Sequence, residues 1–396
     1  MTMRATDSIS RRRLLGGLAS ATALIGAPAI LRAEDVVKIG FLGPLSGALA
    51  FVGQTNHNCL TLAVDELNAA GGAGGRRIEI VAEDSQMSTR TTLEKARKLF
   101  GPDGVAMITG TVLPSEREAI LTVGASVKKL LFHPNFDEGR CHPFLATTGL
   151  AIDQSVVPAV AWLAANSGKS IYVLASDLGT NRDVLVPAIK AAIEARGGKL
   201  AGVQFFPFGT RDFGPAFQQV KDSGADIVWH GIGDDPVTFV KQYRSFEMKP
   251  QLATNLIHES IAAATEGAAA GGLNVESYFM SIDTPANKAM LAAYDKRFAA
   301  SVRRVVRGTT VVLPHGERTY TAVKLWADAV RRAGSLDAEK IRMSFPQVEI
   351  EAPRGTVRLD AAGHVVCEAL FGRVQADNGI ETVARLGNLP ARCLAA

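Results

Sequence analysis

Residues 41–54 read FLGPLSGALAFVGQ, and they join a β-branched apolar run at 36–42 to an amphipathic segment at 54–70. A strand, a glycine-containing loop and a helix form the arrangement in which α/β proteins hold small ligands. The loop matches neither G-x-G-x-x-G nor G-x-x-x-x-G-K-[ST] and contains no lysine, which argues against a nucleotide phosphate. It offers Ser46, Gly47 and backbone N–H groups at a helix start, which suit a carboxylate or a polar carbonyl. We interpret it as a binding loop, with a plain strand-to-helix turn as the alternative.

The rest of the chain continues this alternation of short apolar runs and amphipathic helices. Two such series follow one another, which predicts two lobes, each a mostly parallel sheet flanked by helices. The tail then alternates in polarity and reads as antiparallel strands, with turns at Asp360–Gly363 and Asn378–Gly379. Strands are expected at 76–84, 105–110, 170–176, 200–206 and 226–231, and long helices at 285–299 and 317–333.

The first 33 residues have the layout of an export signal. An arginine cluster at 11–13 precedes an apolar stretch at 14–27 and small residues near a cleavage point after Ala29 or Ala33. Residues 10–15 also resemble the twin-arginine signal that routes folded proteins across the bacterial inner membrane. The apolar stretch is shorter than the roughly 20 residues that span a bilayer, although a membrane anchor is the alternative. We expect a periplasmic protein.

The charge balance changes once this segment is removed. It contains five arginines and one aspartate, against 43 basic and 39 acidic residues in the whole chain, so the remainder carries no formal net charge. That balance leaves no basic surface of the kind that binds nucleic acid. After the signal no apolar run reaches membrane length, so we expect the mature chain not to span a membrane.

The four cysteines are compatible with disulfides in an oxidising compartment. Cys59, Cys141, Cys367 and Cys393 allow three complete pairings. Cys367 and Cys393 flank the expected C-terminal hairpin, which favours that pair. Cys59 lies on an apolar helical face, and we expect it to be a buried thiol.

Motifs for catalysis and metal binding are weak. Ser46 is followed by glycine, but no G-x-S-x-G frame surrounds it. The segment 258–262, HESIA, begins like a zinc-protease helix but lacks the second histidine. The segment 133–142, HPNFDEGRCH, contains ligand types without a closed-site spacing, and a ligand-lining loop is favoured over a metal site. We therefore expect no cofactor, no metal and no enzymatic activity.

Several motifs in order resemble the type I periplasmic solute-binding proteins, which serve ABC importers of branched-chain amino acids, amides and urea. VKIGFLGPLSG at 37–47 and LAVDELNAAGG at 62–72 match the opening strand, loop, helix and glycine turn of that family. Segments farther along are similar to its urea and short-chain-amide branch, and the resemblance covers nearly the whole mature chain. These segments are at 130–139, 207–213, 233–235, 278–291 and 351–364.

The resemblance implies two hinged lobes that close around the ligand, joined by three crossover strands. The crossings are placed near residues 149, 278 and 350. The first lobe then comprises 34–149 plus 279–349, and the second comprises 150–278 plus 350–396.

The resemblance also implies pocket residues in the first lobe. The loop GTVLPSER at 110–117 stands where the branch has an aromatic residue and hydroxyls, with Thr111 at its start and Val112 at the aromatic position. His133 replaces a tyrosine and is followed by Asn135, and Thr148 is a weaker candidate. His133 is expected either to contact the polar end of the ligand or to be a satisfied structural histidine.

In the second lobe the candidates are Asp177, Thr180 and Asp234. Either aspartate could hold an ammonium or amide N–H group, or could cap a helix, which aspartate favours. Trp229 lies in an apolar run and is expected in the core. The departures from the branch put urea itself in doubt as the ligand.

We predict a periplasmic component of an ABC importer that captures a small polar solute by hinge closure and docks on a membrane permease. The solute could be an amide, a urea-like compound, an amino acid or a related molecule. The alternatives are a sensor subunit that presents the closed form to a membrane kinase, and an exported enzyme.

Overall fold

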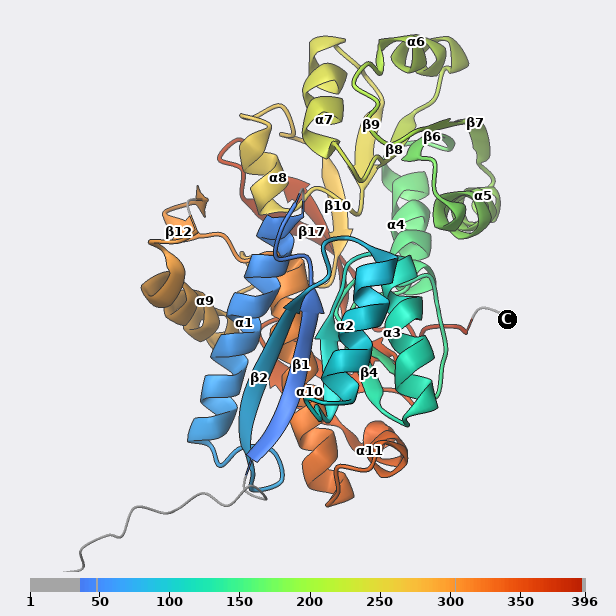
Figure 1. Cartoon of the computed structure of the whole chain (residues 1–396). Coiled ribbons are helices and arrows are strands. Elements are labelled where there is room, and N and C mark those ends of the chain that lie inside the picture. The colour runs from blue at the N-terminus through green and yellow to red at the C-terminus, as the bar shows by residue number, and fades with distance from the viewer. Residues whose placement is uncertain (1–35, 48, 303, 394–396) are drawn as a thin grey trace, which may run out of the picture.

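A computed structural model describes residues 36–47, 49–302 and 304–393. They form two lobes, one containing the blue, cyan and orange segments and the other the green and yellow segments (Figure 1). The predicted class, α/β with largely parallel sheets flanked by helices, is confirmed. The expected export signal lies outside the described residues. Within those ranges, none of the helices combines the length and apolar character needed to cross a bilayer.

The first lobe is built on a five-stranded parallel sheet in the order β2-β1-β3-β4-β5. Alternation along β1 places Phe41 and Leu42 in separate cores on opposite faces of the sheet. The strands are β1 (Val36–Gly43), β2 (Arg77–Asp84), β3 (Met107–Gly110), β4 (Leu130–His133) and β5 (Leu145–Thr147).

Helices cover both faces of this sheet, which explains why the inner strands β3 and β4 are fully buried, whereas the edge strand β2 carries charged residues. The Phe41 core, which we call the first core, contains side chains of α1 (Ala50–Ala69), α9 (Pro285–Phe298), α10 (Pro314–Ala333) and α11 (Ala338–Ser344). The Leu42 core contains side chains of α2 (Thr89–Phe100) and α3 (Pro114–Ser126). The helix expected at 317–333 begins three residues earlier, with Pro314 in its first turn, where proline is favoured.

The second lobe is built on a seven-stranded sheet in the order β17-β16-β10-β9-β8-β6-β7. The strands are β6 (Ser170–Ser176), β7 (Lys199–Phe206), β8 (Ile227–Gly231), β9 (Gln251–Thr254), β10 (Leu273–Glu276), β16 (Ala369–Val374) and β17 (Ile380–Gly387). The first five are parallel, whereas β16 and β17 are antiparallel, as expected for the tail. Trp229 is fully buried, in agreement with its expected place in the core.

Two further cores cover the faces of this second sheet. One contains side chains of α4 (Ile152–Asn166) and α5 (Val186–Glu194), and α5 follows a short π-helix at Asn181–Leu185. The other contains side chains of α6 (Gly214–Ser223), α7 (Pro236–Ser245) and α8 (Glu259–Ala264). Both lobes are therefore three-layered, with helices on each side of a sheet.

The chain passes between the lobes after β5, after β10 and before β16. The last passage between the lobes comes later in the chain than the expected position near residue 350. A small antiparallel sheet intervenes, and its side chains, including Val357 and Val365, belong to the first core. Residues 349–366 therefore pack with the first lobe, although the expected boundary placed residues 350–366 in the second. The sheet consists of β13 (Glu349–Ala352), β14 (Gly355–Leu359) and β15 (Val365–Val366), preceded by a 3-10 turn at Phe345–Gln347.

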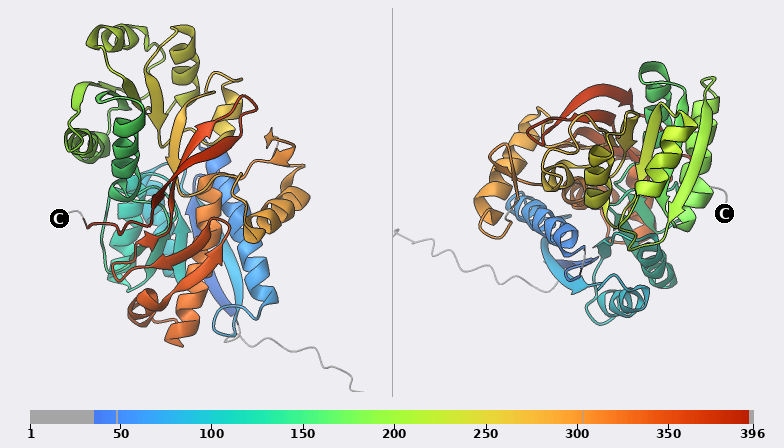
Figure 2. Two further views of the ribbon diagram at one scale, coloured as in Figure 1. Left: turned by 180° about the vertical axis from the view of Figure 1, so that it is seen from behind. Right: turned by 90° about the horizontal axis from the view of Figure 1, so that it is seen from above.

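Two hairpin turns were predicted in the tail, and both are present. The Asp360 amide donates to the His364 carbonyl at 2.9 Å, and the Gln375 amide donates to the Gly379 carbonyl at 2.8 Å. Asn378 has a φ of 65°, a left-handed conformation that asparagine tolerates. Another small hairpin, β11 (Val305–Val306) with β12 (Thr309–Thr310), extends beside α9. Figure 2 shows from behind how the red C-terminal segment runs across the junction of the lobes.

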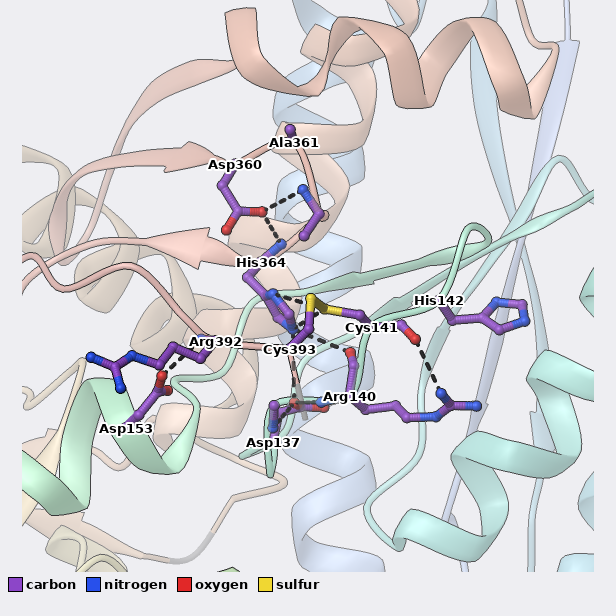
Figure 3. Close-up of a disulfide and its surroundings, with 12 residues drawn as sticks. Asp137, Arg140, Cys141, His142, Asp153, Asp360, Ala361, His364, Arg392 and Cys393 are labelled. Atoms are coloured by element: carbon purple, nitrogen blue, oxygen red, sulfur yellow. Dashed lines mark hydrogen bonds and ion pairs between the residues drawn. A yellow bond between two sulfur atoms is a disulfide. The ribbon is translucent and has the colours of Figure 1, made fainter. Parts of the chain in front are cut away.

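The expected disulfide between Cys367 and Cys393 is wrong. Cys393 is bonded to Cys141, 252 residues away, with a Cα–Cα distance of 5.4 Å (Figure 3). Cys367 is a buried free thiol in the first core, and Cys59 is also buried and free, as expected. The tail turns back along the start of α4, where the Arg392 amide donates to Asp153 Oδ2 at 2.7 Å. That return brings Cys393 to the loop between β4 and β5.

Candidate functional site

The loop after β1, which we interpret as a binding loop, is held in place by contacts with β2 and α1. The Leu45 amide donates to Asp84 Oδ1 at 2.9 Å, while Ser46 is exposed. Burial raises the pKa of Asp84, but hydrogen bonds from Ser46 and nearby amides outweigh that effect and leave the pKa below its ordinary value. The loop also lies directly on α1, because a Cβ added at Gly53 would come 1.8 Å from the Pro44 carbonyl oxygen. Ser46 therefore sits at the surface of a fixed loop.

His133 and Thr111 form a buried pair at the ends of β4 and β3. Thr111 Oγ1 lies 3.2 Å from His133 Nδ1 and donates to the Gly110 carbonyl at 2.6 Å. The Gly110 backbone also forms a hydrogen bond with His133, so the pair is tied to the end of β3. Burial lowers the pKa of His133 well below its ordinary value, and the charges of Arg117 and Arg318 act in the same direction. His133 is therefore neutral at neutral pH.

Val112 and Asn135 lie beside this pair and are half-buried. The side-chain amide of Asn135 donates to the Val112 carbonyl, which ties the loop after β3 to the loop after β4. The Glu116 carboxylate accepts the amides of Val112 and Leu113 at 3.4 and 3.3 Å. The two amides just before α3 are thus satisfied within the lobe, which leaves this helix start less available to an anion.

The ligand-rich segment 133–142 has a structural arrangement. Arg117 is buried and reaches Asp137 at 3.2 Å and Glu138 at 2.7 Å. Cys141 is taken by the disulfide. Among the described residues, no group of three or more histidine, cysteine or acidic side chains could hold a metal ion. The segment therefore fixes the loop that carries Asn135.

Thr148 lies in the first passage between the lobes and is fully buried. Its hydroxyl donates to the Arg318 carbonyl at 3.0 Å, and its amide donates to the His133 carbonyl at 2.9 Å. Both polar groups are engaged inside the protein. This placement gives Thr148 a structural role between α10 and β4.

In the second lobe Asp177 and Asp234 are exposed at the ends of β6 and β8. Asp177 accepts from Arg182, and this bond holds the pKa of Asp177 below its ordinary value. Asp234 accepts from the Ser176 hydroxyl at 3.1 Å and the Gly209 amide at 2.7 Å. The helix cap of α7 is the next residue along, Asp235.

Thr180 is half-buried and immediately precedes the π-helix. It follows Asp177 by three residues on the same loop. The loop thus places Thr180 near the carboxyl end of β6, and its role as a ligand contact stays a prediction.

The structure adds two residues that the sequence did not single out, His258 and His315. His258 precedes α8, and His315 lies in the first turn of α10. Their rings meet edge to face with centroids 6.2 Å apart, which brings the two lobes into contact. HESIA at 258–262 resembles only an incomplete metalloprotease motif, so the sequence does not predict that its histidine lies at the junction of the lobes. The pairing depends on helices 50 residues apart in sequence and leaves no local signal.

The candidate residues stand at the ends of strands in both sheets, and at this level His258 contacts His315 between the lobes. His133 ends β4, whereas Asp177, Asp234 and His258 follow β6, β8 and β9. These are the carboxyl ends of parallel strands, where open α/β sheets bind ligands. The arrangement can hold a small polar molecule between the lobes.

The model of one family, described as periplasmic binding protein, matches residues 36–379. The chain belongs to the periplasmic binding protein family. Leu/Ile/Val-binding protein homolog 6 of Brucella suis is 26% identical over 377 residues, covering 91% of this chain and 93% of that relative. A leucine-, isoleucine-, valine-, threonine- and alanine-binding protein of Pseudomonas aeruginosa is 24% identical, covering 88% of this chain and 92% of that one.

Solved structures share the fold of this periplasmic binding protein. An ABC transporter substrate-binding protein from Sphaerobacter thermophilus has a TM-score of 0.81 and 24% identity, covering 90% of this chain and 99% of that one. A solute-binding protein of an ABC transporter from R. palustris, in complex with benzoate, has a TM-score of 0.77 and 19% identity, covering 90% of this chain and 98% of that one. The predicted family and two-lobed fold are confirmed.

Proposed function

We propose that this periplasmic binding protein is the solute-capturing component of an ABC importer and binds a small polar solute between its lobes. The observation that carries the proposal is the ring contact between His258, which follows β9 of the second sheet, and His315 on α10 of the first lobe. Relatives named for amino acids and a structural neighbour in complex with benzoate support a solute of this size. An amide or urea-like solute, suggested by the sequence resemblance, is one of the compounds to test.

Hinge closure supplies the mechanism. A solute that contacts His133 in the first lobe and the β6 or β8 loop in the second binds the closed form better than the open form. The closed form then docks on a membrane permease. The proposal places the mature chain in the periplasm, after export by the twin-arginine route, as a binding protein without enzymatic activity.

Calorimetric titration of the refolded, ligand-free protein against amino acids, amides, urea and organic acids tests this function. At least one compound is expected to bind saturably with a micromolar Kd and to decrease the radius of gyration measured by X-ray scattering. His133→Ala should weaken that binding, whereas His142→Ala, on the half-buried loop at 142–144, should not. A panel without saturable binding and without a change in radius would count against the proposal.

A further inference from the structure

His258 and His315, which we call the histidine pair, carry unsatisfied polar atoms at the junction of the lobes. The Nδ1 atom of each ring is buried and has no hydrogen-bond partner among the described residues. The two rings are in edge-to-face contact at an interplanar angle of 82°, so the two nitrogens lie on neighbouring rings. Buried polar atoms nearly always have a partner, because leaving them without one is unfavourable. Two such atoms in one place indicate that a polar group of a ligand completes the contact.

We propose that the histidine pair binds the carboxylate of a small organic acid without an amino group, and that binding takes up protons from solution. The inference rests on the proposed solute-binding function and narrows its class of solute. It assigns recognition of the acid to one residue from each lobe. A ligand held in this way would also couple binding to hinge closure.

The cations nearest the histidine pair favour an anion. Arg318 follows His315 by one helical turn and is buried, and its charge disfavours protonation of both histidines. Arg304 acts on His258 in the same direction and donates to the Ser260 hydroxyl on α8. An anion at the histidine pair would therefore lie in a positive potential.

The acidic groups around the histidine pair are engaged elsewhere. Glu276 pairs with Arg318 at 3.3 Å, and Glu317 lies 3.5 Å from Nε of Arg354. Glu259 accepts a backbone amide at 2.7 Å, and burial raises its pKa to about 7, so it carries only part of a negative charge near neutral pH. Oε2 of Glu259 and Oε2 of Glu317 have no hydrogen-bond partner among the described residues, but the first carboxyl is partly protonated and the second lies beside the Arg354 guanidinium.

The carboxylates of the second lobe argue against an amino acid as the solute. An α-ammonium group needs a free acceptor, and carboxylates are the strongest ones. Asp177 is bonded to Arg182, and Asp234 accepts from Ser176 and Gly209. These aspartates are therefore satisfied within their own lobe. An amino acid would therefore bury an ammonium group without a partner, whereas an acid that has no amino group avoids this cost.

The proton uptake follows from the state of the two rings. Burial lowers the pKa of His258 to about 3, and it lowers the pKa of His315 well below its ordinary value, with Arg318 adding to both effects. A carboxylate that accepts from both rings favours the imidazolium form of each and raises both pKa values. The complex then binds more protons than the free protein, so the affinity increases as the pH falls from about 8 to about 5.

Isothermal titration calorimetry of the full mature protein tests the inference. Benzoate and 3-methylbutanoate serve as acids, leucine as the amino acid, and benzamide as the neutral counterpart of benzoate. Titrations in two buffers with different ionisation enthalpies give the number of protons taken up. We expect at least one acid to bind more tightly than leucine and benzamide, with proton uptake and a Kd that decreases toward pH 5.

Two variants and one control assign the effect to the histidine pair. His258→Gln and His315→Gln are expected to weaken acid binding about ten- to hundredfold and to remove the proton uptake, because each loses a charge-assisted hydrogen bond. His142→Gln is the matched control and should retain both. Circular dichroism and thermal melting establish that all three variants fold like the wild type.

The outcomes separate this inference from the proposed function. Leucine binding with closure, without proton uptake and without an effect of either variant, would overturn the inference and leave the importer function standing. Acid binding that is unchanged in both variants would overturn the assignment to the histidine pair. If no compound binds and the radius does not change, both the inference and the proposed function fail.

Discussion

Arg354 and Thr148 join two passages between the lobes. Nη1 of Arg354 donates to the Thr148 carbonyl at 3.0 Å and also to the Ser277 hydroxyl at 2.8 Å. Nε of the same guanidinium lies 3.5 Å from Glu317 on α10. Arg354 is buried, so one side chain connects the chain after β5, the chain after β10 and a helix of the first lobe. Arg354 therefore holds two of the three passages together from inside the protein.

Replacement of Arg354 by methionine is expected to destabilise the protein by about 3–5 kcal/mol, because it leaves the buried Glu317 without its partner. Urea denaturation followed by circular dichroism measures the change. Arg358→Met is the control, since Arg358 is exposed on β14 and its loss should change stability by at most about 0.5 kcal/mol. Adding Glu317→Gln to Arg354→Met should restore part of the loss, and a further loss would contradict the proposed pairing.

The bond between Cys141 and Cys393 ties the C-terminal tail to the first lobe, so the tail forms a covalent link in addition to the three passages. The double variant Cys141→Ser/Cys393→Ser should lose about 2–4 kcal/mol of stability. Peptide mapping by mass spectrometry without reduction should recover a Cys141–Cys393 cross-link, with Cys59 and Cys367 alkylated only after unfolding. A cross-link that contains Cys367 would refute this connectivity.

Gly149 marks a close approach at the first passage. An added Cβ would lie 1.8 Å from the Asn135 carbonyl oxygen, and backbone atoms cannot move aside cheaply. Gly149→Ala should therefore destabilise the fold by about 1–3 kcal/mol or more and weaken solute binding through the displaced loop. Gly233→Ala has no atom within 4 Å of the new Cβ and serves as the control. Equal melting temperatures for the two variants would rule out the close contact.

Glu259 should make stability depend on pH. Burial raises its pKa to about 7 from an ordinary 4.5, so between these values the folded state binds more protons than the unfolded state. The free energy of unfolding therefore falls as the pH rises from about 4.5 to about 7. Glu259→Gln keeps the acceptor for the Met280 amide but removes the titration, and should be more stable than the wild type by about 3 kcal/mol at pH 8.

The stability gained by Glu259→Gln should nearly disappear near pH 4, where the wild-type carboxyl is mostly protonated in both the folded and the unfolded state. Denaturant titrations at pH 4, 6 and 8 measure it. Glu266→Gln is the control, because Glu266 is exposed near the end of the same helix and should show no such trend. A variant less stable than the wild type at pH 8 would mean that Glu259 is stabilised as a carboxylate.

Part of the candidate site was accessible from the sequence. His133 ends an apolar strand of the first sheet, and Asp177 and Asp234 follow apolar strands of the second, so each lies at the carboxyl end of parallel strands in its own sheet. The contact between His258 and His315 was not accessible, because it joins helices of different lobes. For Asp177 and Asp234 the sequence leaves open a ligand contact or a helix cap, and their bonds to Arg182 and Ser176 arise from loops that fold back locally.

The sequence by itself determined the alternation of strands and helices, the two lobes, the C-terminal hairpins and the buried Cys59, because hydrophobic periodicity and turn residues act over a few positions. The tertiary structure decided the Cys141–Cys393 bond, the packing of residues 349–366 against the first core, and the partners of Arg354. Each of these depends on which distant surfaces meet when the lobes pack. That choice is made by burial and charge pairing across the whole chain, and no short stretch of sequence contains it.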